Sequence, residues 1–158
     1  MFIRIPLIFI IYSMKENFAA RRSSLAEKVL DDSAIIVGSA PVKSRISDTD
    51  YAYRQDSNFY YLSGYEEPES LLLLRPGHNT EKFVIFCRDR DPLREQWDGF
   101  RTGQDGAISN YGADAAYSIN AIDKLLPGML DGIKNIYFSM SAPCGVDLKI
   151  KECLELIR

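Results

Sequence analysis

Apolar positions repeat with helical spacing near both ends of the chain. In residues 15–30 they alternate with charged side chains and are accompanied by alanines, a pattern typical of an amphipathic helix. In residues 146–158 the spacing is the same, and no Gly, Asn or Pro signals the end of this second helix before Arg158. We therefore expect the last helix to be cut by the end of the chain rather than completed within it.

Short apolar runs between these helices predict the strands of a sheet. The run Ala34–Val37 is apolar on both faces, which is typical of a central strand covered by helices. The runs Leu71–Leu74 and Phe83–Cys87 flank the turn sequence RPGHNTE, so we expect them to form a hairpin. Further strands are expected at the aromatic run 59–62, which stops at Gly64, at residues 116–119 and at residues 135–140.

The remaining segments are polar or interrupted by Gly and Pro. We expect a loop at residues 39–58 and an irregular stretch at residues 88–106 with a short helix near Leu93–Trp97. A further helix is expected at residues 120–126, which Pro127 ends or kinks. This order of elements predicts an α/β fold, a mixed β-sheet with helices flanking its faces.

Residues 1–13, MFIRIPLIFIIYS, form an apolar extension. They are too short to span a membrane, which takes about 20 apolar residues, and no small-x-small cleavage site follows them as in a signal peptide. Met14 begins a polar, helix-forming sequence, so we expect Met14 to be the natural start and residues 14–158 to form the domain. Two alternatives stay open, a targeting segment and an apolar arm packed on the domain.

Composition and charge exclude several classes of protein. The chain has 158 residues, 46% of them apolar and 26% charged, which fits one globular domain. A net charge of −3, without a cluster of Lys and Arg, argues against a nucleic-acid-binding protein, and we expect no membrane partner. Cys87, Cys144 and Cys153 form no CxxC pair, so we expect reduced cysteines and a cytoplasmic location.

No complete active site can be assembled from the titratable side chains. His78 is the single histidine and lies in a turn, where we expect an ordinary surface residue. Neither a Gly-x-Ser-x-Gly turn nor a phosphate-binding glycine loop occurs. Asp50 is the most suggestive carboxylate, because a buried loop carboxylate would need a partner such as Arg54. The carboxylate pairs, which we expect to cap helices and turns, are Asp31-Asp32, Asp48/Asp50, Glu66-Glu67 and Asp89/Asp91.

Aromatic side chains and arginines concentrate in two stretches. Residues 51–65 hold six aromatic residues around Arg54, a composition found at interfaces and also in tyrosine-rich cores; for most of them we prefer the core. Trp97, the single tryptophan, lies with Phe100 and Arg101 in a Gly-rich loop. That cluster is compatible with local packing and with contact to another surface.

The same stretches resemble the amino-terminal domain of Xaa-Pro aminopeptidase (aminopeptidase P). The similarity lies in YAYRQDSNFYYLSGYEEPE at residues 51–69, and in RDRD at residues 88–91 followed by EQWDGFRTG at residues 95–103. The sequence RRSSL at residues 21–25 agrees as well. The resemblance covers about residues 15–158 and implies the mixed sheet of the creatinase-like amino-terminal domains.

In that family a second domain, of the pita-bread fold, carries out catalysis. It holds two manganese ions and removes the first residue of peptides whose second residue is proline. The resemblance places no catalytic and no metal-binding position in this chain. We therefore expect the chain alone to be inactive and to hold no cofactor, with manganese and peptide substrate bound only where the catalytic domain is present.

The resemblance implies a supporting role for this domain. Trp97 matches a loop tryptophan that reaches the rim of a neighbouring subunit's peptide cleft, and Arg101 lies near it. We expect a homo-oligomer formed through this domain. The alternative is a stand-alone peptide- or protein-binding module derived from a degenerate peptidase. The residues of the aromatic stretch that we expect to serve in packing are Tyr53, Arg54, Phe59 and Tyr61.

Overall fold

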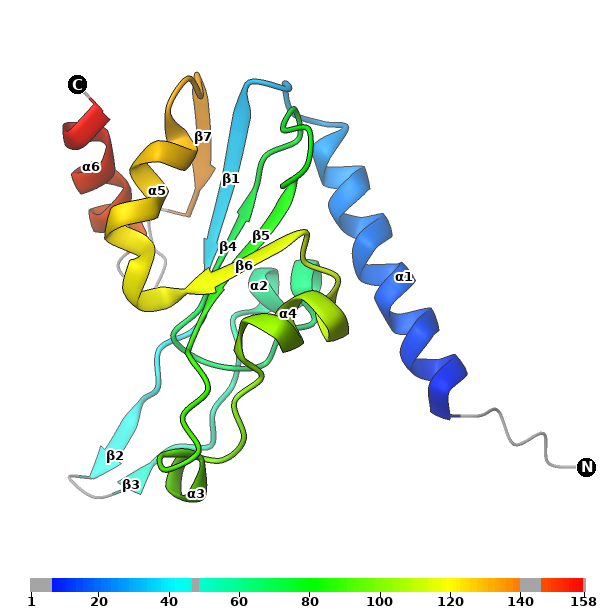
Figure 1. Ribbon diagram of the computed structural model, residues 1–158, viewed down its shortest axis with the longest axis vertical. Coiled ribbons are helices and arrows are strands. Elements are labelled where there is room, and N and C mark those ends of the chain that lie inside the picture. The colour runs from blue at the N-terminus through cyan, green and yellow to red at the C-terminus, as the bar shows by residue number, and fades with distance from the viewer. Residues whose placement is uncertain (1–6, 47–48, 140–145, 158) are drawn as a thin grey trace, which may run out of the picture.

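The computed structural model describes residues 7–46, 49–139 and 146–157, and within them five strands form one mixed sheet (Figure 1). The strands lie in the order β6-β5-β4-β1-β7. The predicted α/β fold is confirmed, and so is the hairpin of β4 and β5. The strand bounds are Ser33–Gly38 for β1, Leu71–Leu74 for β4, Phe83–Cys87 for β5, Ala115–Ser118 for β6 and Asn135–Phe138 for β7.

The central strand β4 is antiparallel to both of its neighbours. Leu73 pairs with Ile36 of β1 on one side and with Val84 of β5 on the other. The outer pairs, β1 with β7 and β5 with β6, are parallel. Four of the strands therefore run in one direction, and their carboxyl ends lie at the same end of the sheet.

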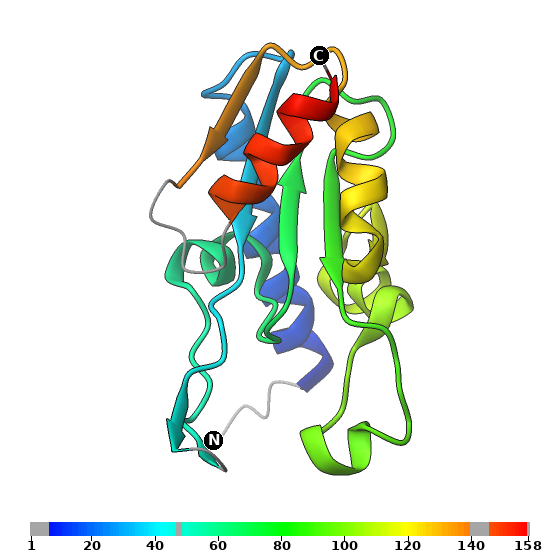
Figure 2. The same ribbon diagram turned by 90° about the vertical axis from the view of Figure 1, so that its left-hand side faces the viewer.

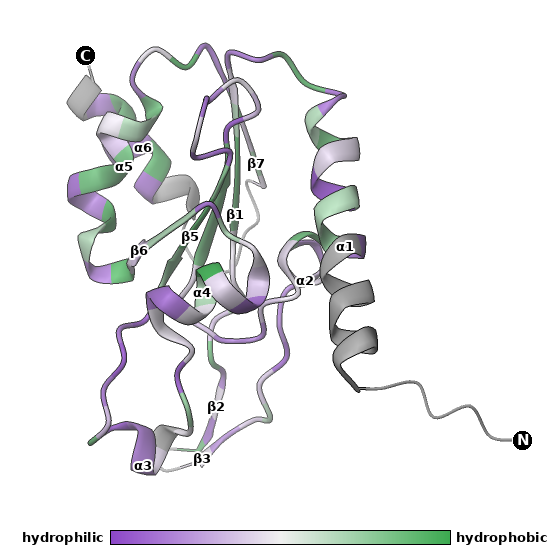
Figure 3. Cartoon of the chain, turned by 45° about the vertical axis from the view of Figure 1, so that its right-hand side comes forward, coloured by the Kyte–Doolittle hydropathy of each residue, from purple (hydrophilic) through white to green (hydrophobic). Residues whose placement is uncertain are grey.

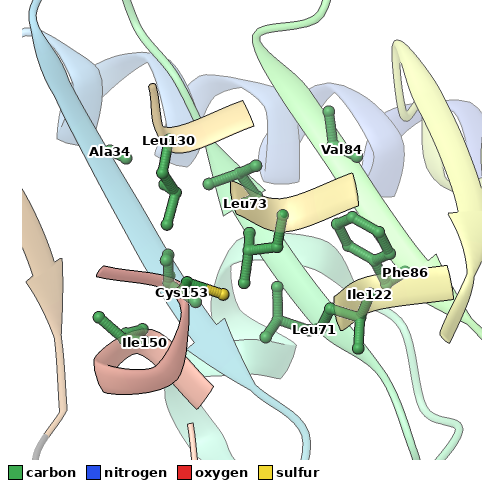
Figure 4. Packing of buried hydrophobic residues seen from close by; sticks show 11 residues of the cluster. Ala34, Leu71, Leu73, Val84, Phe86, Ile122, Leu130, Ile150 and Cys153 are labelled. Atoms are coloured by element: carbon green, nitrogen blue, oxygen red, sulfur yellow. The ribbon is translucent and has the colours of Figure 1, made fainter. Parts of the chain in front are cut away.

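Helices α5 (Ile122–Leu130) and α6 (Val146–Ile157) cover one face of the sheet. Leu130 of α5 and Cys153 of α6 pack over Leu73 of β4, and the close-up of this cluster shows their side chains meeting between helices and strands (Figure 4). Both helices carry their apolar residues on one side. The burial of that side explains why these amphipathic segments fold here.

Helices α1 (Leu7–Ala26), α2 (Ser57–Ser63) and α4 (Gly103–Tyr111) lie on the opposite face. Leu72 and Ile85 point toward this side and are fully buried, together with Phe59 of α2. Because β4 and β5 are covered on both faces, they read as continuous apolar runs, which Figure 3 shows as the most hydrophobic part of the chain.

The aromatic run 59–62, expected to be a strand, is part of helix α2. The carboxylate of Asp56 caps this helix by accepting hydrogen bonds from the backbone N–H groups of Asn58 and Phe59. Gly64 ends it in the left-handed conformation, with φ of 68°, and a Cβ there would lie 2.5 Å from the Phe18 ring. The strand prediction was wrong because, within residues 59–62, only Phe59 and Leu62 are buried. Their separation of three positions places them on one face of a helix, whereas a strand would bury every second residue.

Two other expected irregular segments contain regular structure. The expected loop 39–58 includes the short strands β2 (Ser44–Ile46) and β3 (Thr49–Asp50), which pair with each other. The stretch 88–106 holds α3 (Glu95–Asp98), near the predicted short helix, and then the start of α4, which was not predicted. The glycines of α4 conceal it in the sequence, since glycine weakens helix propensity.

Helix boundaries differ from the predictions at α1 and α5. Helix α1 covers residues 7–26 rather than 15–30. Helix α5 continues through Pro127 to Leu130, because Leu126 and Leu130 bury their side chains against the sheet and offset the hydrogen bond that proline cannot donate. Among the described helices none is long and apolar enough to cross a membrane. Cys144, Asp48 and Met140 lie outside the described residues, and the start at Met14 stays a prediction.

Two arginines fasten α1 to the carboxyl end of α2. Arg21 donates to the carbonyl oxygen of Tyr61 over 3.2 Å and Arg22 to that of Leu62 over 2.8 Å. The guanidinium of Arg22 also lies 3.8 Å from the centre of the Phe83 ring, and burial lowers the pKa of Arg22 to about 10, so it remains charged at neutral pH. Arg21 and Arg22 therefore place positive charge at the carboxyl end of α2, where the last backbone carbonyls of the helix lack partners within the helix.

We predict that Arg22→Met lowers the free energy of unfolding by about 2 kcal/mol, because it removes a charged hydrogen bond and leaves the Leu62 carbonyl without that donor. Urea unfolding followed by circular dichroism measures the change. Arg54→Met is the matched control: Arg54 is exposed, and its replacement should change the free energy of unfolding by less than about 0.5 kcal/mol. Equal effects of the two substitutions would contradict the assigned role of Arg22.

Candidate functional site

Two projections leave the end of the sheet where the parallel strands finish. The first, residues 39–46 and 49–56, follows β1 and contains β2 and β3; we call it the ribbon. The second, residues 88–102, follows β5 and contains α3; we call it the arm. Figure 1 shows both beyond the same end of the sheet, and Figure 2 shows them standing apart. Binding surfaces of α/β domains are commonly built at this end.

The base of the arm is fixed by Asp89. Its carboxylate accepts hydrogen bonds from the Ser118 hydroxyl at 2.7 Å, from Nε2 of Gln104 at 2.9 Å and from Nδ2 of Asn120 at 3.3 Å. The backbone carbonyl of Asp89 accepts a further one from Nη1 of Arg101 at 3.4 Å. Asp89 therefore connects the arm to α4 and to the end of β6.

Arg101 lies inside this base, with 8% of its surface exposed. The expectation that it stands with Trp97 at a rim stays a prediction. The buried Arg101 also has a structural role. Its guanidinium connects the end of the arm to the backbone of Asp89, which lies at the beginning of the arm.

A second set of contacts stiffens the outer part of the arm. Nε and Nη2 of Arg90 donate to the two carboxylate oxygens of Glu95 at 2.6 and 3.0 Å, a bidentate pair. The same guanidinium lies 4.5 Å from the centre of the Phe100 ring. The carboxylate of Asp91 accepts from the backbone N–H groups of Leu93 and Arg94 in the turn that precedes α3. Arg90 thus joins the two sides of the arm across α3.

The tip of the arm presents apolar side chains to solvent. Trp97 is 88% exposed, so the described part of the chain leaves it almost uncovered. Leu93 and Phe100 are also largely exposed. Large apolar side chains gathered on an anchored projection are typical of a contact surface.

The four packing residues expected from the aromatic stretch have different surroundings. Phe59 is fully buried in the core. Tyr53 is half-buried, and its hydroxyl lies 3.0 Å both from the Ala40 carbonyl and from Oε1 of Gln55. Tyr61 and Arg54 are exposed, and with Tyr53 they line a shallow cavity of about 690 Å³. Core packing therefore describes Phe59, whereas Arg54 and Tyr61 lie at the surface.

The other titratable candidates have local structural partners. Nδ1 of His78 accepts from the backbone N–H of Glu81 at 2.9 Å, as a turn residue does. Asp50 is exposed and accepts from the Ser44 hydroxyl at 2.7 Å, so it is not a buried loop carboxylate that needs Arg54 as a partner. Cys87 and Cys153 are buried free thiols, as expected, and burial raises the pKa of Cys87 to about 11.

A manganese site of the kind implied by the family needs several carboxylate and histidine donors at one point. Among the described residues no three His, Cys, Asp or Glu side chains converge in this way. The side chains in the described part of the chain do not fit such a centre, and the expectation that manganese belongs to a further domain stays a prediction.

Comparison with known proteins places these features in a family. The family model "Aminopeptidase P, N-terminal domain" matches residues 18–137, more than half of the chain. The chain belongs to this family. An Xaa-Pro aminopeptidase of Escherichia coli is 34% identical over 145 residues, which cover 91% of this chain and 33% of the relative. Human Xaa-Pro aminopeptidase 3 is 38% identical over 121 residues, covering 74% of this chain and 24% of that protein.

Solved structures agree with the aminopeptidase P assignment. The structure of Pseudomonas aeruginosa aminopeptidase PepP superposes with a TM-score of 0.88 at 42% identity, covering 99% of this chain and 34% of that one. Escherichia coli aminopeptidase P with the inhibitor Pro-Leu gives a TM-score of 0.83 at 34% identity, covering 87% and 32%. The chain thus spans between about a quarter and a third of the length of these relatives.

Sequence reasoning missed how this aminopeptidase P domain supports its arm. Glu67 was expected only to cap a helix or turn, and Gln55 was not considered, yet both lie at the junction of the arm and the ribbon. The signal for Glu67 was its place in the motif at residues 51–69. Its partners lie 21 and 35 residues further along the chain, so they could not be identified from the sequence.

We predict that Glu95 titrates below the ordinary range of a glutamate, because its hydrogen bonds from Arg90 lower the pKa of the carboxyl group. The pair therefore stabilises the arm above the pKa of the unfolded chain and loses this effect as the pH falls through the folded pKa. Carboxyl carbon shifts recorded by NMR between pH 7 and pH 2 measure the titration.

Arg90→Met should raise the pKa of Glu95 toward the ordinary range, because the hydrogen bonds from Arg90 are the largest cause of its lowering. Arg94→Met is the matched control, because Arg94 is paired with Asp91 instead, at 3.8 Å, and its loss should leave Glu95 unchanged. A normal titration of Glu95 in the unaltered protein would refute the assigned pair.

Proposed function

We propose that this chain is the non-catalytic amino-terminal part of an Xaa-Pro aminopeptidase, a manganese peptidase that removes a residue preceding proline. Its role is to join subunits and to supply Trp97 to the rim of a neighbour's peptide cleft. The peptide and the metal ions bind to the remaining two thirds of the protein. The buried free thiols of Cys87 and Cys153 support a reducing, cytoplasmic setting.

The single observation that carries the proposal is the exposure of Trp97 on a supported arm. A tryptophan side chain is costly to leave in water unless it is covered in an assembly, and tryptophan is enriched among the residues that dominate binding energies. The proposed partner is a second copy of this protein, since the relatives are peptidases that share this domain.

We predict that the isolated chain shows no turnover of an Xaa-Pro peptide with added manganese, because the described residues bring no metal-binding donors together. Product release is measured by chromatography, with the Escherichia coli enzyme as positive control. Turnover that rises in proportion to chain concentration and disappears with a chelator would refute the division of roles.

We predict that the chain self-associates and that Trp97→Ala raises the dissociation constant at least about tenfold, because a buried interface tryptophan commonly contributes about 2 kcal/mol or more. Sedimentation velocity over a concentration series measures the constant. Leu30→Ala is the matched control, since Leu30 is also largely exposed but precedes the amino end of β1, whereas the arm follows the carboxyl end of β5. A monomer at every concentration, or equal effects of both substitutions, would count against assembly through the arm.

A further inference from the structure

The loop between α2 and β4 lies where the arm and the ribbon meet, and Glu67 belongs to it. Oε1 of Glu67 accepts a hydrogen bond from the backbone N–H of Thr102 at 2.6 Å. Oε2 pairs with Nη2 of Arg88 at 3.4 Å. Arg88 is the first residue of the arm and Thr102 the last, so one carboxylate holds both ends of the projection.

These contacts are shielded from solvent. The side chains of Glu67 and Arg88 are 15% and 13% exposed. Removing one partner of such a pair leaves the other charge poorly solvated and uncompensated. Thr102 directly precedes α4, whose first N–H groups favour a negative charge nearby, so the position suits a carboxylate better than a neutral acceptor.

Gln55 holds Glu67 from the side of the ribbon. Its Nε2 donates to the backbone carbonyl of Glu67 at 3.0 Å, while its Oε1 accepts from the backbone N–H groups of Ala40 at 2.8 Å and Asp56 at 2.9 Å. Ala40 and Asp56 stand near the two ends of the ribbon. Gln55 therefore connects the two ends of the ribbon, as Glu67 connects the two ends of the arm. A hydrogen bond also links Gln55 to Glu67.

We infer that Glu67 is a positioning residue that fixes the arm, and with it Trp97, in one orientation relative to the sheet. The benefit of a fixed arm rests on the proposed function: an arm that is already ordered loses less conformational entropy when a partner covers Trp97. The order itself is a property of the isolated chain and is measured without any partner or activity.

The test is backbone ¹⁵N relaxation of the 158-residue chain, at a concentration where it is monomeric. In the unaltered protein we expect order parameters of about 0.85 through residues 89–101, as in the strands. Glu67→Ala should lower them below about 0.6 in the arm while β4 and β5 stay rigid. Glu67→Gln keeps an acceptor for the Thr102 N–H but loses the charge facing Arg88, so an intermediate value is expected.

Glu66→Ala is the matched control, since Glu66 is the exposed neighbour of Glu67 and should leave the arm ordered. An arm already mobile in the unaltered protein, or equally ordered in Glu67→Ala, would overturn the inference. A loss of order in the strands as well would show a general structural role and would also overturn it.

Association distinguishes this inference from the proposed function. If Glu67→Ala loosens the arm and also weakens self-association, both stand. If the arm loosens while self-association is absent or unchanged, the positioning role of Glu67 stands and assembly through the arm fails.

Discussion

The two antiparallel pairings of β4 set the direction of the other strands. All four leucines of β4 are buried, and a fully buried leucine side chain contributes about 1.5 to 3 kcal/mol, so the strand has a strong preference for this central place. Because the chain reverses on each side of β4, β1 and β5 run in the same direction. The ribbon and the arm must then leave the sheet at the same end, where the loop carrying Glu67 can contact both. The surface at that end is therefore a consequence of how the middle of the sheet is paired.

Much of this fold could be predicted from the sequence because its strands are buried on both faces. Runs such as Leu71–Leu74 and Phe83–Cys87 have no polar position that would fit a solvent-facing side, and both were placed correctly. The errors fall where periodicity is short or hidden. Helix α2 has only seven residues, and its capping residues Asp56 and Gly64 are better signals than its aromatic composition.

The candidate site was predictable only in part. A lone tryptophan in a Gly-rich loop left both local packing and contact with another surface open, the family resemblance favoured contact, and Trp97 is exposed. The support of the arm could not be predicted, because Glu67, Arg88 and Thr102 come together only after β4 and β5 have paired. The burial of Arg101 could not be predicted for the same reason. A charged side chain in a polar loop gives no indication of which backbone carbonyl it will contact in the folded chain.

The position of the single tryptophan also makes its fluorescence a probe of the tip of the arm. Selective excitation of the indole examines only the end of the arm, since the remaining aromatic residues are phenylalanines and tyrosines. Its emission should resemble that of an indole in water while the tip is free, and should shift to shorter wavelength when another surface excludes water from it. Unfolding of the sheet, by contrast, should change the emission little, because the indole is already almost fully hydrated in the native state.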